Sequence, residues 1–216
     1  MRDTIIQAIL EHKIIAIVRG VDPKQALEAA RALAEGGIRL VEVTFNQAEP
    51  ANFCKTAEAI RLIKEELGDK VFVGAGTVTS PELVEMAASA GAGYIISPDM
   101  DPAVIRRTRE LGLVSLPGAY TATEAKQAWV NGADFVKLFP CIEGAPAYLK
   151  ALCAPLNHIR FLAVGGITAE NAGVFLKAGA VGVGVGGSLV NKKWVENGEY
   201  ARITQEAKRF VAAVAE

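Results

Sequence analysis

The chain has 216 residues, 51% of them hydrophobic, and its 23 basic and 24 acidic side chains give a net charge of −1. This balance argues against a nucleic-acid-binding protein, which normally carries a basic surface. The longest uncharged stretch, residues 178–191, contains five glycines in fourteen residues and is shorter than the roughly 18 apolar residues of a membrane-spanning helix, so we expect no membrane interaction.

Short apolar, β-branched runs recur along the chain, and their starts are 20 to 30 residues apart. Each run is the length of a buried strand. A helix over residues 3–12 is predicted before the first of them. The predicted strands are Ile14–Val18, Val41–Thr44, Val71–Val73, Tyr94–Ile96, Val114–Leu116, Phe135–Phe139, Arg160–Val164 and Gly182–Val185.

The segments between the strands carry helix signals. Apolar residues recur at helical spacing over residues 26–34 and again over residues 203–214. Glycines that follow these segments are typical helix ends. The predicted helix starts are Asp22-Pro23, Ser80-Pro81, Asp101-Pro102, Thr121–Glu124 and Thr168, and the predicted stops are Gly36-Gly37, Gly91, Gly112, Gly132 and Gly179.

Strands that alternate with helices pair in parallel, because each crossover between parallel strands contains a helix. The runs are apolar throughout, as expected for strands covered on both faces. Since 216 residues hold eight units of 27, we predict a (β/α)₈ TIM barrel with an extra N-terminal helix. An open, doubly wound sheet is the alternative. No linker or low-complexity tract divides the chain, so residues 1–216 are interpreted as a single domain.

The composition also suggests a compartment. Three cysteines, Cys54, Cys141 and Cys153, are odd in number and show no pattern, which favours a reducing cytoplasm over a disulfide scaffold. Charged residues at positions 2, 3 and 11 interrupt the apolar stretch near the start, so no signal peptide is expected. We therefore expect a cytoplasmic protein.

Lys137 is the strongest functional candidate. It lies inside an apolar strand, Phe135–Phe139, and function in TIM barrels collects at the carboxyl ends of the strands. Desolvation lowers the pKa of a lysine and leaves its amine free to attack a carbonyl carbon. A lysine that reaches solvent or closes an ion pair is the structural alternative.

Glu42 and Arg19 occupy similar positions on the first two strands. Glu42 interrupts the second strand, where a carboxylate close to a desolvated lysine can move protons during imine chemistry. A structural ion pair with Lys137 or Arg19 is the alternative, and the two interpretations are compatible with each other. Arg19 ends the first strand, and a fixed cation there can hold a carboxylate or a phosphate.

Glycine clusters follow three of the strands. Residues 74–77, Gly-Ala-Gly-Thr, close the third strand and allow a ligand to approach the backbone, although a tight turn explains them as well. Gly165-Gly166 follows the seventh strand and Gly186-Gly187-Ser188 the eighth. These two loops are where TIM barrels commonly bind phosphate through backbone N–H groups.

Other site types find no support in the sequence. The two histidines, His12 and His158, fall in the N-terminal helix and before the seventh strand. We therefore expect no metal site and a mechanism without zinc. No nucleotide-binding or nucleophile-elbow motif occurs, so no cofactor is expected.

Together these segments resemble, along nearly the whole chain, the 2-keto-3-deoxy-6-phosphogluconate (KDPG) and 4-hydroxy-2-oxoglutarate (KHG) aldolases. The resemblance implies a class I, metal-free lyase on a TIM barrel, acting on a small keto acid in carbohydrate metabolism of the Entner-Doudoroff type and assembled as a homotrimer. The matching motifs are Ile15–Arg19, Val41–Thr44, Gly74–Val78, Ser97-Pro98, Pro117-Gly118, Val136–Pro140, Gly165–Ile167 and Val185–Ser188.

The resemblance also implies roles for single residues. Lys137 is similar to the lysine that forms the Schiff base with the keto carbon, and Glu42 to the general acid/base that acts through a water. Thr77 matches the residue that binds the pyruvyl carboxylate. The remaining matches are to residues that line the site, Arg19 and Pro98, and to the phosphate cradle, Gly165, Gly166, Gly186, Gly187 and Ser188.

Two positions depart from the common pattern of the family. Many KDPG enzymes have an arginine four residues after the glutamate, where this chain has Asn46, and many have a threonine before the first glycine pair, where it has Val164. These residues are similar to those of the branch that acts on the C4 epimer, 2-keto-3-deoxy-6-phosphogalactonate. Cleavage of that epimer is one alternative function. A different phosphate-binding barrel enzyme, such as a thiamine-phosphate-synthase-like protein, or a non-catalytic barrel are more remote ones.

Overall fold

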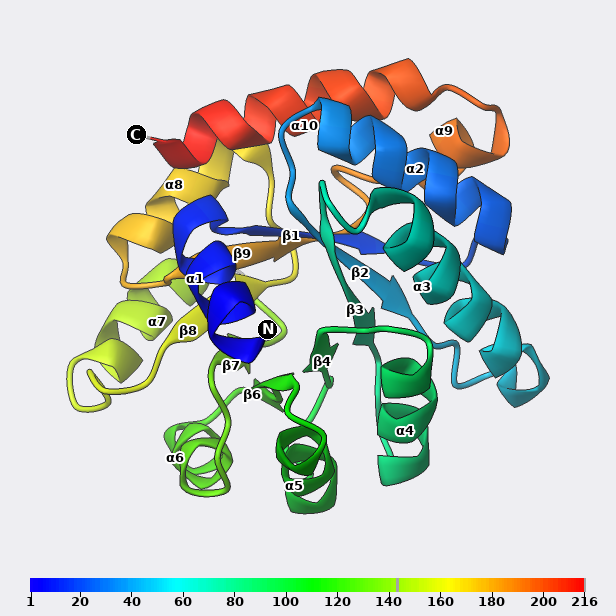
Figure 1. Ribbon diagram of the computed structural model, residues 1–216. Helices are drawn as coiled ribbons and strands as arrows, with labels where there is room; N and C mark the ends of the chain where they lie inside the picture. Colours follow the sequence, from blue (N-terminus) through cyan, green and yellow to red (C-terminus); the bar gives the residue numbers. More distant parts are fainter. Residues whose placement is uncertain (143, 216) are drawn as a thin grey trace.

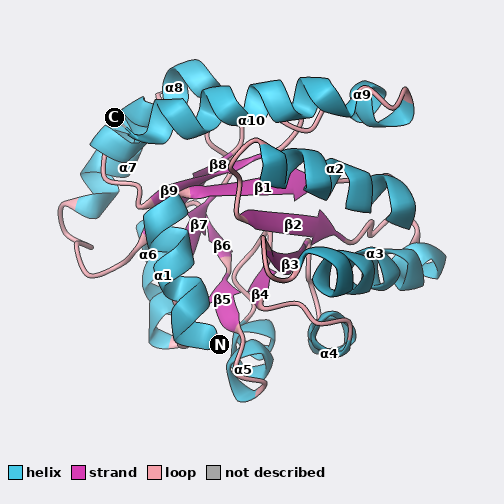
Figure 2. Ribbon diagram, turned by 45° about the horizontal axis from the view of Figure 1, so that its top comes forward, coloured by secondary structure: helices cyan, strands magenta, loops and turns pink. Residues whose placement is uncertain are grey.

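The computed structural model describes residues 1–142 and 144–215, and its strands form one parallel sheet surrounded by helices (Figures 1 and 2). The order of neighbouring strands in the sheet is β5-β4-β3-β2-β1-β9-β8-β7-β6. The strands are β1 (Ile14–Val18), β2 (Leu40–Thr44), β3 (Phe72–Gly76), β4 (Tyr94–Ile96), β5 (Val114–Leu116), β6 (Gly118–Ala119), β7 (Val136–Leu138), β8 (Phe161–Val164) and β9 (Gly182–Val185).

The helices lie outside the strands, apart from α1, which crosses one end of the barrel (Figure 1). Among the described residues, none of these helices combines the length and the apolarity needed to cross a bilayer. They are α1 (Arg2–His12), α2 (Pro23–Glu35), the 3₁₀ turn η1 (Pro50–Asn52), α3 (Phe53–Leu67), α4 (Pro81–Ser89), α5 (Pro102–Glu110), α6 (Ala122–Val130), α7 (Ala145–Cys153), α8 (Ala169–Lys177), α9 (Lys192–Glu196) and α10 (Tyr200–Ala215).

Strands β5 and β6 are two parts of the fifth barrel strand, separated by Pro117. Residues 114–116 pair with β4, whereas residues 118–119 pair with β7. The Pro117 carbonyl accepts a hydrogen bond from the Lys137 N–H at 2.9 Å, while proline itself has no N–H to give to a strand neighbour. The sheet is therefore a nearly closed (β/α)₈ barrel, which confirms the predicted fold and its extra N-terminal helix.

The predicted helix starts are confirmed where side-chain caps form. Asp22 accepts hydrogen bonds from the N–H groups of Lys24 and Gln25, both at 3.1 Å, in a complete capping box. Thr121 and Glu124 form a second capping box at the start of α6. These caps supply partners for the free N–H groups of the first helical turn, and they fix where each loop at the carboxyl ends of the strands gives way to a helix.

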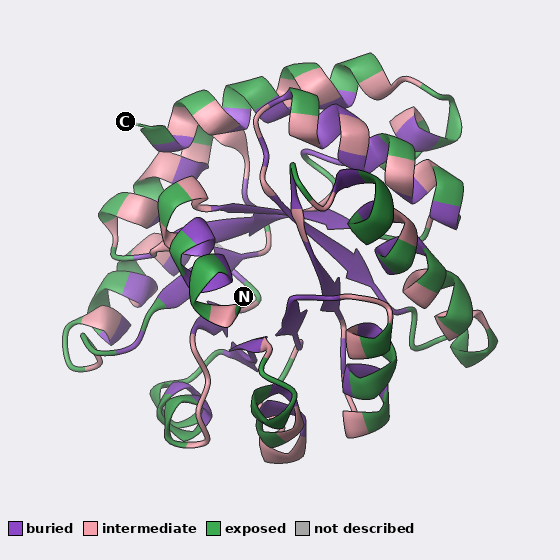
Figure 3. Cartoon of the chain, in the orientation of Figure 1, coloured by how far each residue is buried: buried purple, intermediate pink, exposed green. Residues whose placement is uncertain are grey.

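Alternation along the strands sorts the buried residues into two groups. Ala16, Val41, Val136 and Ala163 belong to the layer between strands and helices, with α2, α8 and α10 outside it. Ile15, Leu40, Phe135 and Leu162 fill the barrel interior together with Ile5, Ile9 and Tyr94. Apart from the half-buried Phe72, the strand residues are buried, and the helices expose their outer faces (Figure 3).

The same alternation places two charged residues inside the barrel. Leu40 and Phe135 point into the interior, so Glu42 and Lys137, each two residues further along its strand, face the same side. Both charges therefore lie one layer above the apolar interior, toward the carboxyl ends of the strands.

Candidate active site

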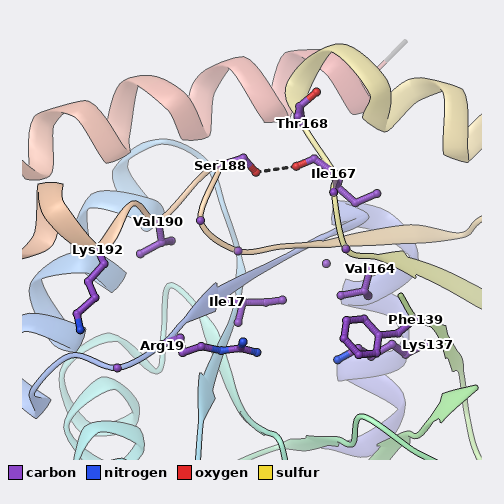
Figure 4. Close-up of a pocket in the computed structure, with 16 residues that line it drawn as sticks. Ile17, Arg19, Lys137, Phe139, Val164, Ile167, Thr168, Ser188, Val190 and Lys192 are labelled. Atoms are coloured by element: carbon purple, nitrogen blue, oxygen red, sulfur yellow. Dashed lines mark hydrogen bonds between the residues drawn. The ribbon is translucent and has the colours of Figure 1, made fainter. Parts of the chain in front are cut away.

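A cavity of about 610 Å³ opens at the carboxyl ends of β1, β7, β8 and β9 (Figure 4). It brings together eight of the predicted site residues, from segments up to 170 positions apart in sequence. They are Arg19, Lys137, Val164, Gly165, Gly166, Gly186, Gly187 and Ser188, and the other lining residues are Ile17, Gly20, Phe139, Ile167, Thr168, Gly184, Val190 and Lys192.

Lys137 is buried at the base of this cavity, with 6% of its surface exposed. Its Nζ lies 4.6 Å from the centre of the Phe139 ring. Burial lowers the pKa of Lys137 below the ordinary value of 10.5, and the positive charge of Arg19 lowers it further, while the charge of Glu42 acts in the opposite direction. The environment thus favours the neutral, nucleophilic amine.

Glu42 lies on β2 and is 2% exposed. Burial raises the pKa of its carboxyl group above 4.5, against the opposing effects of Lys137 and then Arg19. In the described part of the chain no ion pair joins Glu42 to Lys137 or to Arg19 within 4.0 Å. The carboxyl group therefore feels the charge of Lys137 without being paired to it, and burial favours its protonated form.

Arg19 follows the end of β1 and is exposed at the cavity. In Figure 4 its side chain extends across the cavity toward Lys137. The Val18 side chain packs in the layer between strands and helices. Because successive side chains of a strand point to opposite faces, Ile17 and Arg19 point toward the barrel interior. The arginine therefore adds a fixed positive charge on the side where Lys137 lies.

Two glycine loops form the wall of the cavity above Val164. Gly165 and Gly166 have φ values of +104° and +63°, a backbone conformation that side-chain-bearing residues rarely adopt. Gly186 and Gly187 have neither a positive φ nor any atom within 4 Å of an added Cβ. No contact with the described residues requires glycine at these two positions, so the open space over their backbone belongs to the cavity.

The two loops are joined to each other and to a helix start. Ser188 Oγ donates a hydrogen bond to the Ile167 carbonyl at 2.6 Å (Figure 4). Thr168, which also lines the cavity, is the N-cap of α8. The first N–H groups of a helix and its dipole favour an anion nearby. This end of the cavity therefore has the character of an anion site.

Glu42, Thr77 and Pro98 are the predicted site residues that do not line the cavity. Thr77 follows β3 with φ +55°, and its carbonyl accepts a hydrogen bond from Gln47 Nε2 at 2.8 Å. Pro98 follows β4, and its carbonyl oxygen lies 2.3 Å from the position of a Cβ on Gly118. These residues lie at the carboxyl ends of neighbouring strands of the same barrel.

The sequence did not indicate several lining residues, and among those in the described part of the chain the charged one is Lys192. The sequence predicts Thr168 as a helix start and Phe139 as part of a strand and of the motif Val136–Pro140, without a site role for either. The signal in the sequence that could have indicated Lys192 is its place only four residues after Ser188. The turn that directs it back to the cavity depends on the hydrogen bonds from Leu189 and Val190 to the Gly186 carbonyl.

Comparison with known proteins is consistent with this geometry. Residues 5–206 match the family model described as KDPG and KHG aldolase. The 2-dehydro-3-deoxy-6-phosphogalactonate aldolase of Escherichia coli K12 is 38% identical over 204 residues, which are 94% of this chain and 95% of that protein. The 2-dehydro-3-deoxy-phosphogluconate aldolase of Treponema pallidum is 34% identical over 98% of both chains. A solved structure described as native KDPGal superposes with a TM-score of 0.83, at 38% identity and 94% coverage of both chains.

Proposed function

Because the chain belongs to the KDPG and KHG aldolase family, we propose that it is a class I aldolase that cleaves a 2-keto-3-deoxy-6-phospho sugar acid to pyruvate and glyceraldehyde 3-phosphate. The observation that carries this proposal is the buried Lys137 amine, with its lowered pKa, at the base of the cavity. A larger fraction of such an amine is neutral and able to attack a keto carbon than of an exposed lysine. Cleavage of 4-hydroxy-2-oxoglutarate to pyruvate and glyoxylate belongs to the same proposal.

In the proposed reaction the Lys137 amine adds to the keto carbon, C2, to give a carbinolamine. Glu42, whose pKa is raised by burial, donates a proton through a water to the carbinolamine hydroxyl, and this group leaves as water. The product is a protonated imine on Lys137. The Glu42 carboxylate is then the base for the next step, so one group serves as acid and as base.

Cleavage follows from the charge of the imine. The Glu42 carboxylate removes the proton of the C4 hydroxyl through the water, and C4 becomes the aldehyde carbon of the leaving product. The electron pair of the C3–C4 bond moves to the imine and forms an enamine. Glu42 returns the proton to C3, and water releases pyruvate and the free amine. Thr77, Arg19 and Pro98 are assigned to the keto-acid end of the substrate, and the glycine loops with Ser188 to its phosphate.

Reductive trapping tests the proposal. With pyruvate and borohydride, the wild-type protein should gain the mass of a reduced pyruvate adduct on Lys137. Lys137→Ala should gain none, while Lys150→Ala, at an exposed helix position, should be labelled like the wild type. An unmodified wild-type protein, or a labelled Lys137→Ala variant, would refute the proposal.

A second candidate substrate is the C4 epimer, 2-keto-3-deoxy-6-phosphogalactonate. Asn46 and Val164 favour it, as does the name of the 38% identical relative from E. coli. Side-by-side product assays with the gluconate and galactonate phosphates and 4-hydroxy-2-oxoglutarate distinguish the candidates. A Val164→Thr variant should shift the epimer ratio, because Val164 lines the cavity. An unchanged ratio would remove the argument from this position.

We also propose that residues 1–216 act as one domain, in the cytoplasm, as a homotrimer. The apolar side chains of Trp129 and Val130 on α6, 48% and 64% exposed, support an interface between copies. Free cysteines at 54, 141 and 153 fit a reducing compartment. Light scattering should give three times the 22.8 kDa mass of the chain, and a monomer would refute the trimer.

A further inference from the structure

Lys192 occupies the side of the cavity opposite Lys137. In Figure 4 the two side chains are separated by Ile17 and Arg19. Lys192 is the first residue of α9 and follows the loop of Gly186, Gly187 and Ser188. Its Nζ lies 4.0 Å from the position that a Cβ on Gly20 would take, so the side chain reaches from the end of β9 to the end of β1.

The charges of the cavity are all positive. Among the described residues that line it, the charged ones are Arg19, Lys137 and Lys192, and none is a carboxylate. Lys137 is committed to the imine, and Arg19 extends toward it (Figure 4). Lys192 is therefore the lining cation that remains for the end of a substrate remote from the keto group.

Lys192 can exchange its ion pair with Glu196 for a contact with a ligand, because that pair is exposed. Its ammonium group lies 3.7 Å from Glu196 Oε1, and the two side chains are 61% and 51% exposed. An exposed pair of this kind contributes little to stability. At equal distance a phosphate dianion attracts the ammonium group more strongly than a single carboxylate does, since the Coulomb energy grows with the charge of the ligand.

From these observations we propose that Lys192 is a specificity-determining residue, which selects substrates that carry a phosphate at the end remote from the keto carbon. The inference rests on the proposed aldolase function and adds a residue to it. Backbone N–H groups of the glycine loops bind an oxyanion without distinguishing its charge state well, whereas a lysine adds a point charge that favours the dianion. Phosphorylated substrates are therefore preferred over 4-hydroxy-2-oxoglutarate, whose remote end is a carboxylate.

The neighbouring lysine offers a matched control. Lys193 carries the same charge and is exposed on the same short helix, but it does not line the cavity. Lys192→Ala should lower kcat/KM for the phosphorylated substrate by about tenfold, mainly through KM, as expected for one charge–phosphate contact. It should leave the rate of pyruvate trapping by borohydride unchanged. Lys193→Ala should change neither quantity, and Lys192→Arg should retain the preference for the phosphorylated substrate.

Inorganic phosphate provides a readout that does not require turnover. Its binding, measured by calorimetry at low salt, should weaken in Lys192→Ala and stay unchanged in Lys193→Ala. Equal phosphate affinity in all three proteins, or equal losses in the two alanine variants, would overturn the role of Lys192. If the wild-type protein failed to trap pyruvate, the proposed aldolase function would fall, while phosphate binding would still decide the role of Lys192.

Discussion

A Cβ atom at position 76 would lie 1.6 Å from Oε1 of Glu42. In the pairing of β2 with β3, Glu42 is opposite Gly74 and Thr44 is opposite Gly76. The carboxyl group of Glu42 therefore extends over the backbone of the neighbouring strand at Gly76. The absence of a side chain at position 76 gives this carboxyl group its place inside the barrel.

Gly76→Ala should displace the Glu42 carboxyl group and leave the fold intact, because the atoms that meet the new methyl group belong to the end of a flexible side chain. Activity should fall on the order of 10²-fold, as for loss of a general acid/base. Steady-state kinetics measure the effect beside Glu42→Gln. An active Gly76→Ala enzyme would show that the position of Glu42 does not matter for the reaction.

Gly74→Ala is the matched comparison on the same strand. Its Cβ would lie 2.2 Å from the buried ring of Tyr94, which cannot move aside without disturbing the interior. We expect a loss of about 1–3 kcal/mol in the free energy of unfolding, as for other overpacked cores. Denaturant titration of both glycine variants should therefore separate a loss of stability at position 74 from a loss of activity at position 76.

Gly187→Ala tests the phosphate cradle. An added Cβ at this position has no neighbour within 4 Å, so the variant should unfold at the wild-type temperature. It would still occupy the space over the loop backbone, and KM for the phosphorylated substrate should rise by roughly tenfold or more, which corresponds to ~1.4 kcal/mol. Trapping with pyruvate, which has no phosphate, should be unaffected. An unchanged KM would place the phosphate elsewhere.

Gln47→Ala tests how Thr77 is held. Thr77 is a β-branched residue with φ +55°, a conformation that costs about 1–3 kcal/mol unless its surroundings enforce it. The hydrogen bond from Gln47 Nε2 to the Thr77 carbonyl, 2.8 Å long, is one such restraint. Its loss should raise KM for pyruvate several-fold in the reverse reaction, the condensation of pyruvate with the aldehyde, with a smaller effect on kcat in steady-state kinetics.

Gln127→Ala is the control for that experiment, because Gln127 is exposed on α6, on the far side of the barrel sheet from β2 and β3. The pyruvate KM of this variant should equal that of the wild type. If Gln47→Ala behaved in the same way as Gln127→Ala, the restraint on Thr77 would have to come from the backbone alone.

Glu42→Gln should change stability in a pH-dependent way. Burial raises the pKa of Glu42 in the folded protein, so the folded state holds its proton to higher pH than the unfolded state does. The resulting stabilisation is present below the unfolded pKa and is lost as the pH rises through the folded pKa. The glutamine cannot ionise, so the variant should gain stability relative to the wild type as the pH rises. Thermal unfolding from pH 4 to 8 measures this, and a constant difference would contradict it.

The strands could be predicted from sequence because their residues are buried on both faces. Four predicted strands, Ile14–Val18, Tyr94–Ile96, Val114–Leu116 and Gly182–Val185, coincide with the observed ones. Three others differ by one residue at one or both ends, and the third strand starts one residue later and ends three residues later than predicted, because hydrogen bonds decide the boundary. The third strand extends to Gly76 because β2 pairs along its whole length. The short β6 was missed, since two small residues after a proline carry no strand pattern.

The site could be predicted where strands carry it. Lys137 and Glu42 are recognisable because a charge inside an apolar strand is rare. Loop residues are different, because a loop's path depends on distant contacts. Lys192 reaches the cavity through a turn built on the Gly186 carbonyl, and Gln47 meets Thr77 across two strand ends. Neither relationship leaves a local pattern in the sequence.

Helix α1 closes the end of the barrel opposite the cavity. Ile5 and Ile9 pack against the interior residues, and Arg2 pairs with Asp134, which also accepts from Arg109. Under the proposed chemistry, both products must then leave through the opening by which the substrate entered. The pyruvyl fragment is still bound covalently to Lys137 at the base of the cavity when the aldehyde is formed. The aldehyde therefore departs first and pyruvate second. The covalent bond to Lys137 makes product release ordered, and in the reverse reaction pyruvate binds before the aldehyde through the end of the barrel that the helix leaves open.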